Sequence, residues 1–352
     1  MFSRHLATSL ARRARCASTR ALLYFQSDSV PRGLTSSGVV GTNRDLQGSD
    51  GEFFGVDPVP TPVEIRDGRG AGMTLDENGF TLVPHAWDHI DYNDNGAIVN
   101  RYYAECEALV AKHTGATRVL AFDHNVRAKR RKQAASQLSG DGANAVQEPL
   151  VTYGVHNDYT LTSAPRRIEQ LAAGQLGAND TLRARAGDGE GGNGGGAGGG
   201  GALQTDELDG LLRRRWCFVN VWRNIVEASP VRSFPLALCD AASVSSDDLV
   251  VFEIRYADRV GENYFVRHDA RQRWWYYPEL TRDEAVLIKC WDSRGADFLG
   301  MFEAARGLPH DAADADSAVP ATFSLHSAFE DPASPPEAPD RESIEVRLVA
   351  FF

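Results

Sequence analysis

A histidine and an aspartate two residues apart are the first candidates for chemistry in this sequence. His156 and Asp158 lie in the run Val155–Thr160, and in a β-strand residues i and i+2 point to the same side. An imidazole and a carboxylate would then face one metal ion. A second imidazole would complete the two-histidine, one-carboxylate set that binds non-haem iron(II) and leaves positions open. Alone, the pair is weak evidence, because this spacing also arises by chance in surface turns.

His326 is the candidate for the second imidazole. It lies in a β-like run, Leu325–Phe329, far downstream of the first pair. An isolated histidine in such a run more often packs in a core than binds a metal. Taken together, the three residues predict a catalytic iron(II) site whose metal ligands are His156, Asp158 and His326.

Two further residues, which follow His326 in the sequence, could bind a co-substrate of such an iron. Arg341 and Ser343 lie on one face of a predicted strand whose other face is apolar. A guanidinium forks onto a carboxylate and a hydroxyl adds a hydrogen bond, which suits the distal carboxylate of 2-oxoglutarate. Arg347 lies on the same face and is the rival for this role, with a solvated pair to Glu345 as its plain alternative. Arg223, at the end of an apolar run, could contact 2-oxoglutarate or an acidic substrate group, or form a buried ion pair.

The order of these residues along the chain is more telling than any one of them. H-x-D, a long gap, a histidine, and R-x-S beginning 15 residues later is the order found in 2-oxoglutarate-dependent oxygenases. We therefore predict an oxidoreductase that uses Fe(II) and 2-oxoglutarate to hydroxylate or desaturate a small organic molecule. Two alternatives stay open: an iron dioxygenase that does not use 2-oxoglutarate, and a non-catalytic jelly-roll accessory protein.

Many short β-type runs separated by turn residues must position these side chains. They lie at residues 216–222, 249–256, 263–266, 274–277, 285–291, 322–329 and 343–352. This spacing is typical of an antiparallel sandwich or barrel and not of βαβ units. The expected fold is mainly β, a double-stranded β-helix (jelly roll, cupin-like) with flanking helices. One helix is predicted near 96–113, where apolar residues recur at helical spacing.

Two segments differ in composition from the rest. Residues 1–45 are predicted to form a targeting-like or disordered N-terminal arm, because residues 1–27 hold five arginines and no acidic residue, as in mitochondrial or plastid transit peptides. Residues 46–352 are predicted to form one oxygenase domain. A glycine-rich insertion at about 172–210 interrupts it, and such a tract should be disordered. The expected location is cytoplasmic, or an organelle if residues 1–27 are a transit peptide.

The amino-acid composition limits the classes of molecule that the protein is expected to bind. The net charge of −11 gives no electrostatic help in binding nucleic acid or anionic lipid. The five cysteines are scattered, without a CxxC pair, which argues against a zinc site or a disulfide framework. No apolar run approaches the length needed to span a bilayer. We expect a small-molecule substrate and neither nucleic acid nor membrane as partner, with substrate identity and oligomeric state left open.

Several further segments resemble the AsaB-like hydroxylase/desaturase family, which includes the fungal gibberellin desaturase and the CmcJ component of cephamycin 7α-methoxylation. The matching segments are Phe122–Arg127, Val155–Thr160, Ser163–Pro165, Asn220–Arg223, Pro235–Asp240, Trp275–Pro278, Lys289, Asp292–Ser293, His326–Phe329 and Arg341–Arg347. The resemblance runs from about residue 60 to the C-terminus, without the insertion. It implies oxidative tailoring in secondary metabolism, with the family's iron ligands at the three positions named above. Two features depart from the family: Gln272 stands where its members tend to carry a histidine, and the insertion after Gln170 is unusual.

Overall fold

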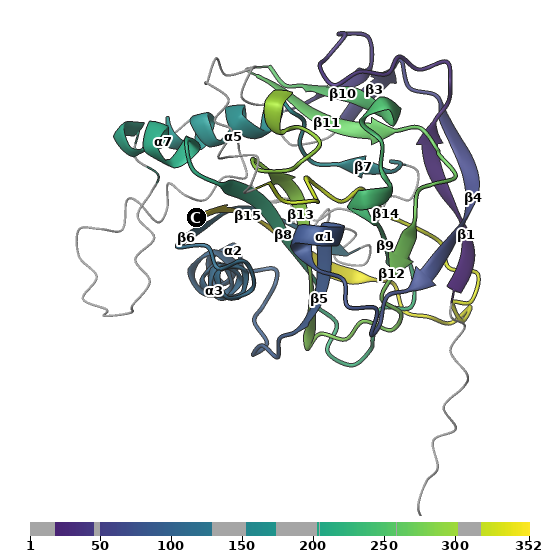
Figure 1. Ribbon diagram of the computed structural model, residues 1–352. Helices are drawn as coiled ribbons and strands as arrows, with labels where there is room; N and C mark the ends of the chain where they lie inside the picture. The colour runs from purple at the N-terminus through teal and green to yellow at the C-terminus, as the bar shows by residue number, and fades with distance from the viewer. Residues whose placement is uncertain are drawn as a thin grey trace, which may run out of the picture.

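Two β-sheets packed face to face form the body of the protein (Figure 1). In this computed structural model of the chain, the structure describes residues 18–45, 50–128, 153–173, 203, 205–257, 259–301 and 318–352. The fold is mainly β and is a jelly roll, as predicted. Within the described ranges, no helix is both long enough and apolar enough to cross a membrane.

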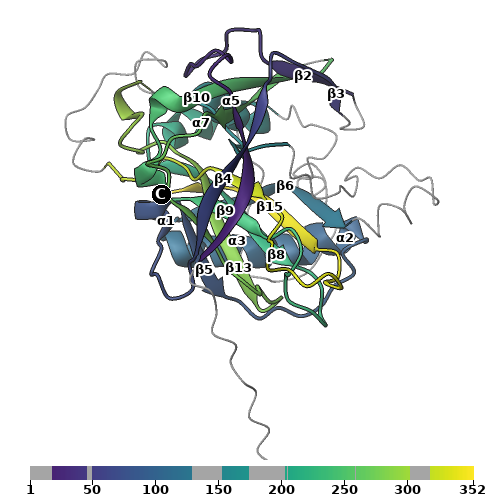
Figure 2. The same cartoon turned by 90° about the vertical axis from the view of Figure 1, so that its right-hand side faces the viewer.

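The larger sheet has ten strands among the described residues. In spatial order they are β1 (Ser18–Gln26), β4 (Pro58–Asp67), β12 (Trp274–Tyr276), β9 (Leu236–Cys239), β14 (His326–Ala328), β7 (His156–Asn157), β11 (Val260–Val266), β10 (Leu249–Arg255), β2 (Gly41–Arg44) and β3 (Asp50–Phe54). Figure 2 shows β1 and β4 running along the side of the molecule that faces the viewer.

The smaller sheet has five strands in the same part of the chain. They are β5 (Phe80–Pro84), β13 (Glu284–Asp292), β8 (Trp216–Asn224), β15 (Glu342–Phe351) and β6 (Arg118–Ala128). After the glycine-rich tract, most strands begin and end within three residues of the predicted runs. The prediction worked because these strands are apolar on both faces and buried, which makes their runs visible in the sequence.

Helices cover the outside of this sandwich. They are α1 (Leu75–Asn78), α2 (Asn95–Ala97), a π-helical turn (Ile98–Tyr102), α3 (Tyr103–Thr114), α5 (Ser163–Ala172) and α7 (Thr205–Leu212), with 3-10 turns at Ala241–Ser243 and Ser246–Asp248. From α2 through α3 the chain is continuously helical, which confirms the helix predicted near 96–113. Figure 1 shows α3 beside the smaller sheet, where it shares a buried apolar cluster with that sheet's outer face.

Alternation along β15 assigns its side chains to two environments. Ile344, Val346 and Leu348 pack outward against the α3 layer. Ser343 and Arg347 therefore point inward between the sheets, since successive strand residues face opposite sides. Polar and charged groups in such a place must be paired or must bind a ligand, because burying them alone is costly.

The prediction of a targeting-like or disordered arm over residues 1–45 is wrong from Ser18 onward. Strand β1 pairs with β4 along its whole length, from Ser18 opposite Arg66 to Gln26 opposite Pro58. Leu23 and Phe25 alternate into the core, and their burial outweighs the polar composition on which the arm was predicted. Residues 1–17 lie outside the described residues, so the transit peptide stays a prediction.

The insertion expected at about 172–210 also ends earlier than predicted. Helix α7 begins at Thr205 and packs beside α5. Leu212, at its C-terminal end, is buried in the main core. The glycine-rich residues themselves lie outside the described part of the chain.

An ion cluster at the end of β13 gives a prediction about stability. Lys289, which is 1% exposed, places Nζ 2.8 Å from Asp292 Oδ2 and 2.7 Å from Asp76 Oδ1. Arg215 approaches the same Asp292 oxygen at 2.7 Å. Asp292→Ala should lower the free energy of unfolding by about 3 kcal/mol, because it leaves a buried ammonium without its fully buried partner. Urea denaturation measures the change.

An exposed pair provides the control for that experiment. Glu64 and Arg66 lie 3.7 Å apart with both side chains largely in solvent. Glu64→Ala should change the free energy of unfolding by less than about 1 kcal/mol. Equal effects of the two substitutions would contradict the stabilising role of the buried cluster.

Candidate active site

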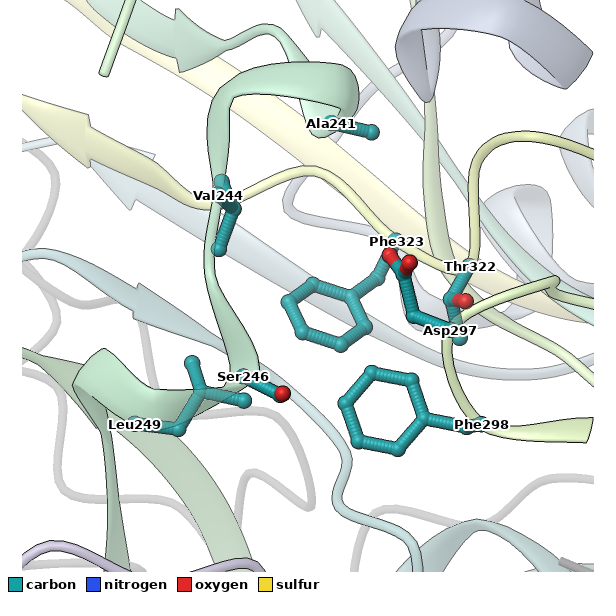
Figure 3. A pocket seen from close by; sticks show the side chains of 8 residues that line it. All are labelled: Ala241, Val244, Ser246, Leu249, Asp297, Phe298, Thr322 and Phe323. Carbon is teal, nitrogen blue, oxygen red and sulfur yellow. The ribbon is translucent and has the colours of Figure 1, made fainter. Parts of the chain in front are cut away.

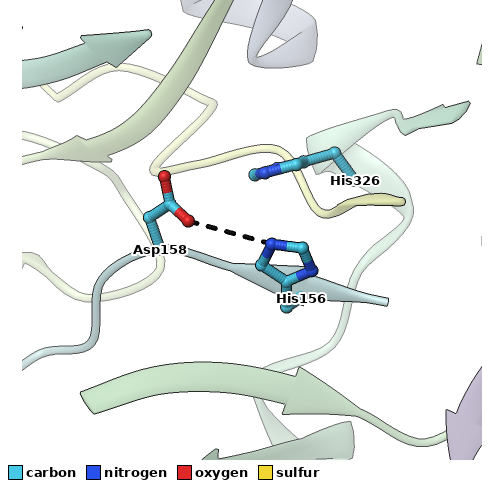
Figure 4. Close-up of side chains that lie close together, drawn as sticks. All are labelled: His156, Asp158 and His326. Carbon is cyan, nitrogen blue, oxygen red and sulfur yellow. Dashed lines mark ion pairs between the residues drawn. The ribbon is translucent and has the colours of Figure 1, made fainter. Parts of the chain in front are cut away.

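Two neighbouring strands of the larger sheet bring the two histidines together. Strand β14 pairs with β7 so that His326 lies directly opposite His156, with ring centroids 4.6 Å apart. Asp158 follows β7 immediately, and its Oδ1 lies 3.8 Å from His156 Nε2. One possible ligand atom from each of the three residues lies within 4.8 Å of the other two. Figure 4 shows the three side chains converging on one point.

Backbone carbonyls orient both imidazoles. His156 Nδ1 lies 3.0 Å from the carbonyl of Gly154, and His326 Nδ1 lies 3.2 Å from that of Ser324. A hydrogen on each Nδ1 donates to its carbonyl, which leaves each Nε2 as an acceptor for a metal. Burial, reinforced by His326, lowers the pKa of His156 to about 3. His156 is therefore neutral near pH 7, as metal binding requires.

Asp158 is held ionised. Its Oδ2 accepts hydrogen bonds from Asn220 Nδ2 at 2.8 Å and from Arg347 Nε at 3.4 Å. Burial alone would raise the pKa of Asp158, but Arg347 and the two histidines hold it well below its usual range. Two imidazoles and one carboxylate oxygen thus converge, and this donor set fits iron(II).

Gly154 carries the backbone geometry that orients His156. Its φ is +95°, and a Cβ added there would lie 3.1 Å from the carbonyl oxygen of Tyr24. That same oxygen accepts the backbone N–H of Val155 at 2.9 Å. Gly154→Ala should destabilise the protein by about 1–3 kcal/mol, because alanine is strained at this φ, and it should weaken metal binding, because this turn carries the carbonyl that orients the imidazole.

A second glycine provides a matched control for this prediction. Gly115 also has a positive φ, +75°, but a Cβ there meets no atom within 4 Å. It ends α3, outside the sandwich. Gly115→Ala should cost stability without changing metal affinity. Metal titration together with urea denaturation separates the two variants, and unchanged metal affinity in Gly154→Ala would contradict the role of the turn.

Arg341 and Ser343 present unsatisfied groups to the interior. Arg341 is 5% exposed and donates through Nη1 to the carbonyl of Phe234. Among the described residues, Arg341 Nε and Ser343 Oγ find no hydrogen-bond partner. Burial, reinforced by the neighbouring Arg127, lowers the pKa of Arg341 to about 9. Buried polar groups normally have partners, so an anionic ligand suits this position.

Neighbouring strands connect this position to the metal ligands. The guanidinium carbon of Arg341 lies 5.5 Å from the ring centroid of Trp222. Trp222 is two residues from Asn220 on β8, so both side chains face the interior. Asn220 in turn donates to Asp158. An anion on Arg341 would therefore lie in the same interior, between the two sheets, as the three metal ligands.

The other two predicted arginines are already engaged. Arg347 contacts Asp123 at 2.7 Å, Glu345 at 3.2 Å and Asp158 at 3.4 Å. Its guanidinium is thus paired with three carboxylates within the site.

Arg223 lies on the opposite face of the smaller sheet. It pairs with Ile344, which faces the α3 layer. Its guanidinium donates to the hydroxyl of Tyr102 at 3.0 Å and to the carbonyls of His85 and Arg282 at 2.8 and 2.6 Å. The structure does not bring Arg223 to the metal ligands, because the face of β8 that it occupies points away from them.

Asn220 is a site residue that the sequence prediction missed. It is the polar member of the inward row Trp216, Phe218, Asn220, Trp222. A lone amide in a row of aromatic residues is the signal that could have found it, because a buried amide needs a partner.

A small hollow elsewhere in the molecule does not compete with this site. Figure 3 shows it between the 3-10 turns after β9 and the segment around Phe298 and Phe323. Its cavity volume of about 10 Å³ holds about one water molecule. None of the three metal ligands lines it, and it is too small for an organic substrate.

Comparison with known proteins identifies the family. The family model described as "Oxidoreductase/YMDC permease-like domain" matches residues 39–187 and 201–351. The Fe(II)/2-oxoglutarate-dependent dioxygenase nvfI of Aspergillus novofumigatus is 27% identical over 301 residues, covering 83% of this chain and 84% of that protein. The hydroxylase/desaturase asaB of Aspergillus flavus is 30% identical over 159 residues, covering 42% of this chain and 60% of that protein.

A solved structure has the same fold. The iron and alpha-ketoglutarate-dependent endoperoxidase NvfI, in one of its conformations, superimposes with a TM-score of 0.65 at 23% identity. The match covers 95% of this chain and 97% of that one. The chain belongs to the oxidoreductase/YMDC permease-like family, and its relatives include AsaB-like hydroxylases and desaturases.

Proposed function

We propose that His156, Asp158 and His326 hold iron(II) in an oxygenase whose co-substrate, 2-oxoglutarate, is anchored by Arg341 and Ser343. The observation that carries the proposal is the convergence of two carbonyl-oriented imidazoles and one ionised carboxylate oxygen on a single point. The relatives named as iron- and 2-oxoglutarate-dependent dioxygenases support the same chemistry. The substrate is a small organic molecule.

The protein's own groups prepare the site for this reaction. Iron(II) and 2-oxoglutarate, when bound, supply the oxidation of substrate by O₂ that is coupled to release of CO₂ and succinate. His156 is kept neutral by burial, and Asp158 is kept ionised by Arg347. Arg341 offers its guanidinium and Ser343 its hydroxyl to the far carboxylate of the co-substrate, which fixes its orientation. His326, Arg341 and Ser343 are buried, and the side chains of His156 and Asp158 are only 16% and 10% exposed.

Anaerobic titration of the metal-free protein tests the proposal. One equivalent of Fe(II), followed by 2-oxoglutarate, should produce the visible absorption band of their chelate. Admission of O₂ should then yield succinate. Oxygen uptake without succinate would favour an iron dioxygenase that does not use 2-oxoglutarate. Failure to bind Fe(II) stoichiometrically would overturn the enzyme in favour of a non-catalytic jelly-roll protein.

Product mass distinguishes the two outcomes that the relatives' names suggest. Curated relatives are called hydroxylase/desaturase, and both reactions begin with removal of a hydrogen atom from substrate. Hydroxylation adds one oxygen atom, whereas desaturation removes two hydrogens. Mass spectrometry of products from a panel of candidate secondary metabolites would identify the reaction.

A further inference from the structure

Arg347 has a role in the site that is separate from co-substrate binding. We infer that Arg347 is a positioning residue: it pins one oxygen of Asp158 so that the other faces the metal, and it takes no part in binding 2-oxoglutarate. The inference rests on the proposed iron site. It concerns the smaller sheet's contribution to a centre whose ligands come from the larger sheet.

The contacts of Asp158 divide its two oxygens between two tasks. Oδ2 accepts from Asn220 of β8 and from Arg347 of β15, at 2.8 and 3.4 Å. Both donors belong to the smaller sheet, whereas Asp158 follows β7 of the larger one. Oδ1 is directed to His156 Nε2 at 3.8 Å. Because Oδ2 already receives two donors, Asp158 is arranged to bind a metal through Oδ1 alone.

The rest of the guanidinium is fixed by acceptors on β6 and β15. Nη1 lies 2.7 Å from Asp123 Oδ2, and Nη2 lies 3.2 Å from Glu345 Oε1. When the amide of Asn125 is oriented with its oxygen toward the guanidinium, it accepts from Nη1 at 2.7 Å and from Nη2 at 3.0 Å. These contacts hold the side chain in place, so that its Nε is pre-positioned against Asp158.

The charge around Arg347 also disfavours 2-oxoglutarate there. Three carboxylates, on Asp123, Asp158 and Glu345, lie within 3.4 Å of the guanidinium nitrogens. A dianionic co-substrate would meet these negative charges at close range, where like charges repel strongly. Arg341 instead contacts the backbone carbonyl of Phe234 and the ring of Trp222.

Paired titrations of the full-length protein test the inference. Arg347→Met should weaken Fe(II) binding by about 10–100-fold, the usual cost of losing a partner of a metal ligand, and should change the affinity of the iron-loaded protein for 2-oxoglutarate by less than about threefold. Arg341→Met should show the reverse pattern. Arg347→Lys should recover part of the metal affinity, because an ammonium can still donate a hydrogen bond to Oδ2.

Cobalt(II) provides a readout that loss of stability alone does not change. Its visible spectrum reports the number and arrangement of its ligands, so Arg347→Met should alter the spectrum of the Co(II)-loaded protein. Asn220→Ala removes the other donor to Oδ2 without changing charge. It should weaken Fe(II) binding by about tenfold, which keeps the inference testable if Arg347→Met does not fold.

Two results would overturn the inference. In one, Arg347→Met or Asn220→Ala binds Fe(II) and Co(II) as the wild type does. In the other, Arg347→Met weakens 2-oxoglutarate binding as much as Arg341→Met. If the wild type did not bind Fe(II), this result would instead contradict the proposed function itself. Binding by the wild type with no change in either variant would remove only the role of Arg347.

Discussion

Replacing His156 by alanine is expected to abolish both iron(II) binding and turnover. The substitution leaves Asp158 and His326 as a two-residue site, which holds the metal poorly in competition with water. Loss of a residue that only hydrogen-bonds to a metal ligand can lower metal affinity by roughly 100-fold. Loss of a ligand itself should lower it by more. Anaerobic Fe(II) titration and the absorption band with 2-oxoglutarate would measure it, and the band should be absent.

The fold should survive this change, since His156 lies at the end of a two-residue strand and its ring faces the site. His113 on α3 provides the matched control, because it is exposed on the outer layer of the molecule. His113→Ala should bind Fe(II) as the wild type does. One equivalent of tightly bound Fe(II) in His156→Ala would refute the assignment of this residue as a ligand.

Arg341→Met is expected to have the second largest effect, on 2-oxoglutarate. Truncating one member of a buried, hydrogen-bonded charge pair costs about 2–5 kcal/mol. At about 1.4 kcal/mol per factor of ten, this raises the dissociation constant for 2-oxoglutarate by about 30-fold or more. Titration of the iron-loaded protein with 2-oxoglutarate measures the constant, while Fe(II) affinity without co-substrate should be nearly unchanged.

Two milder substitutions refine that experiment. Arg341→Lys keeps the charge but loses the planar fork, so its dissociation constant should lie between those of the wild type and Arg341→Met. Ser343→Ala removes one hydrogen bond to a charged group, which costs about 1.5–3 kcal/mol. Wild-type affinity for 2-oxoglutarate in Arg341→Met would mean that another residue anchors the co-substrate.

Strand alternation explains why much of the architecture was predictable. Short apolar runs between turns marked most strands after the glycine-rich tract, and the spacing of His156 and Asp158 placed both on one side. The four-residue strand β9 was missed because Leu236–Cys239 is too short to show a period. It nevertheless pairs with β14 and so helps to position His326.

The environment of each arginine could not be predicted in the same way. Both faces of β8 are buried, so hydrophobic pattern alone does not say which face Arg223 occupies. Arg347 of β15 and Arg341, which immediately precedes this strand, both contact inward-facing residues, as their spacing predicts. Their different partners depend on Asp123 and Asp158, which come from distant strands and are brought near only by the tertiary fold.

The three metal ligands come from the larger sheet, but the hydrogen-bond donors to Asp158 come from the smaller one, so a bound cation would couple the two sheets. The imidazoles move with the larger sheet, but the carboxylate is tethered by Asn220 and Arg347 to the smaller one. Sliding of one sheet over the other would displace the carboxylate of Asp158 relative to the two imidazoles. Conversely, an occupied site resists that sliding, since a ligand that binds the closed arrangement more tightly shifts the equilibrium toward it.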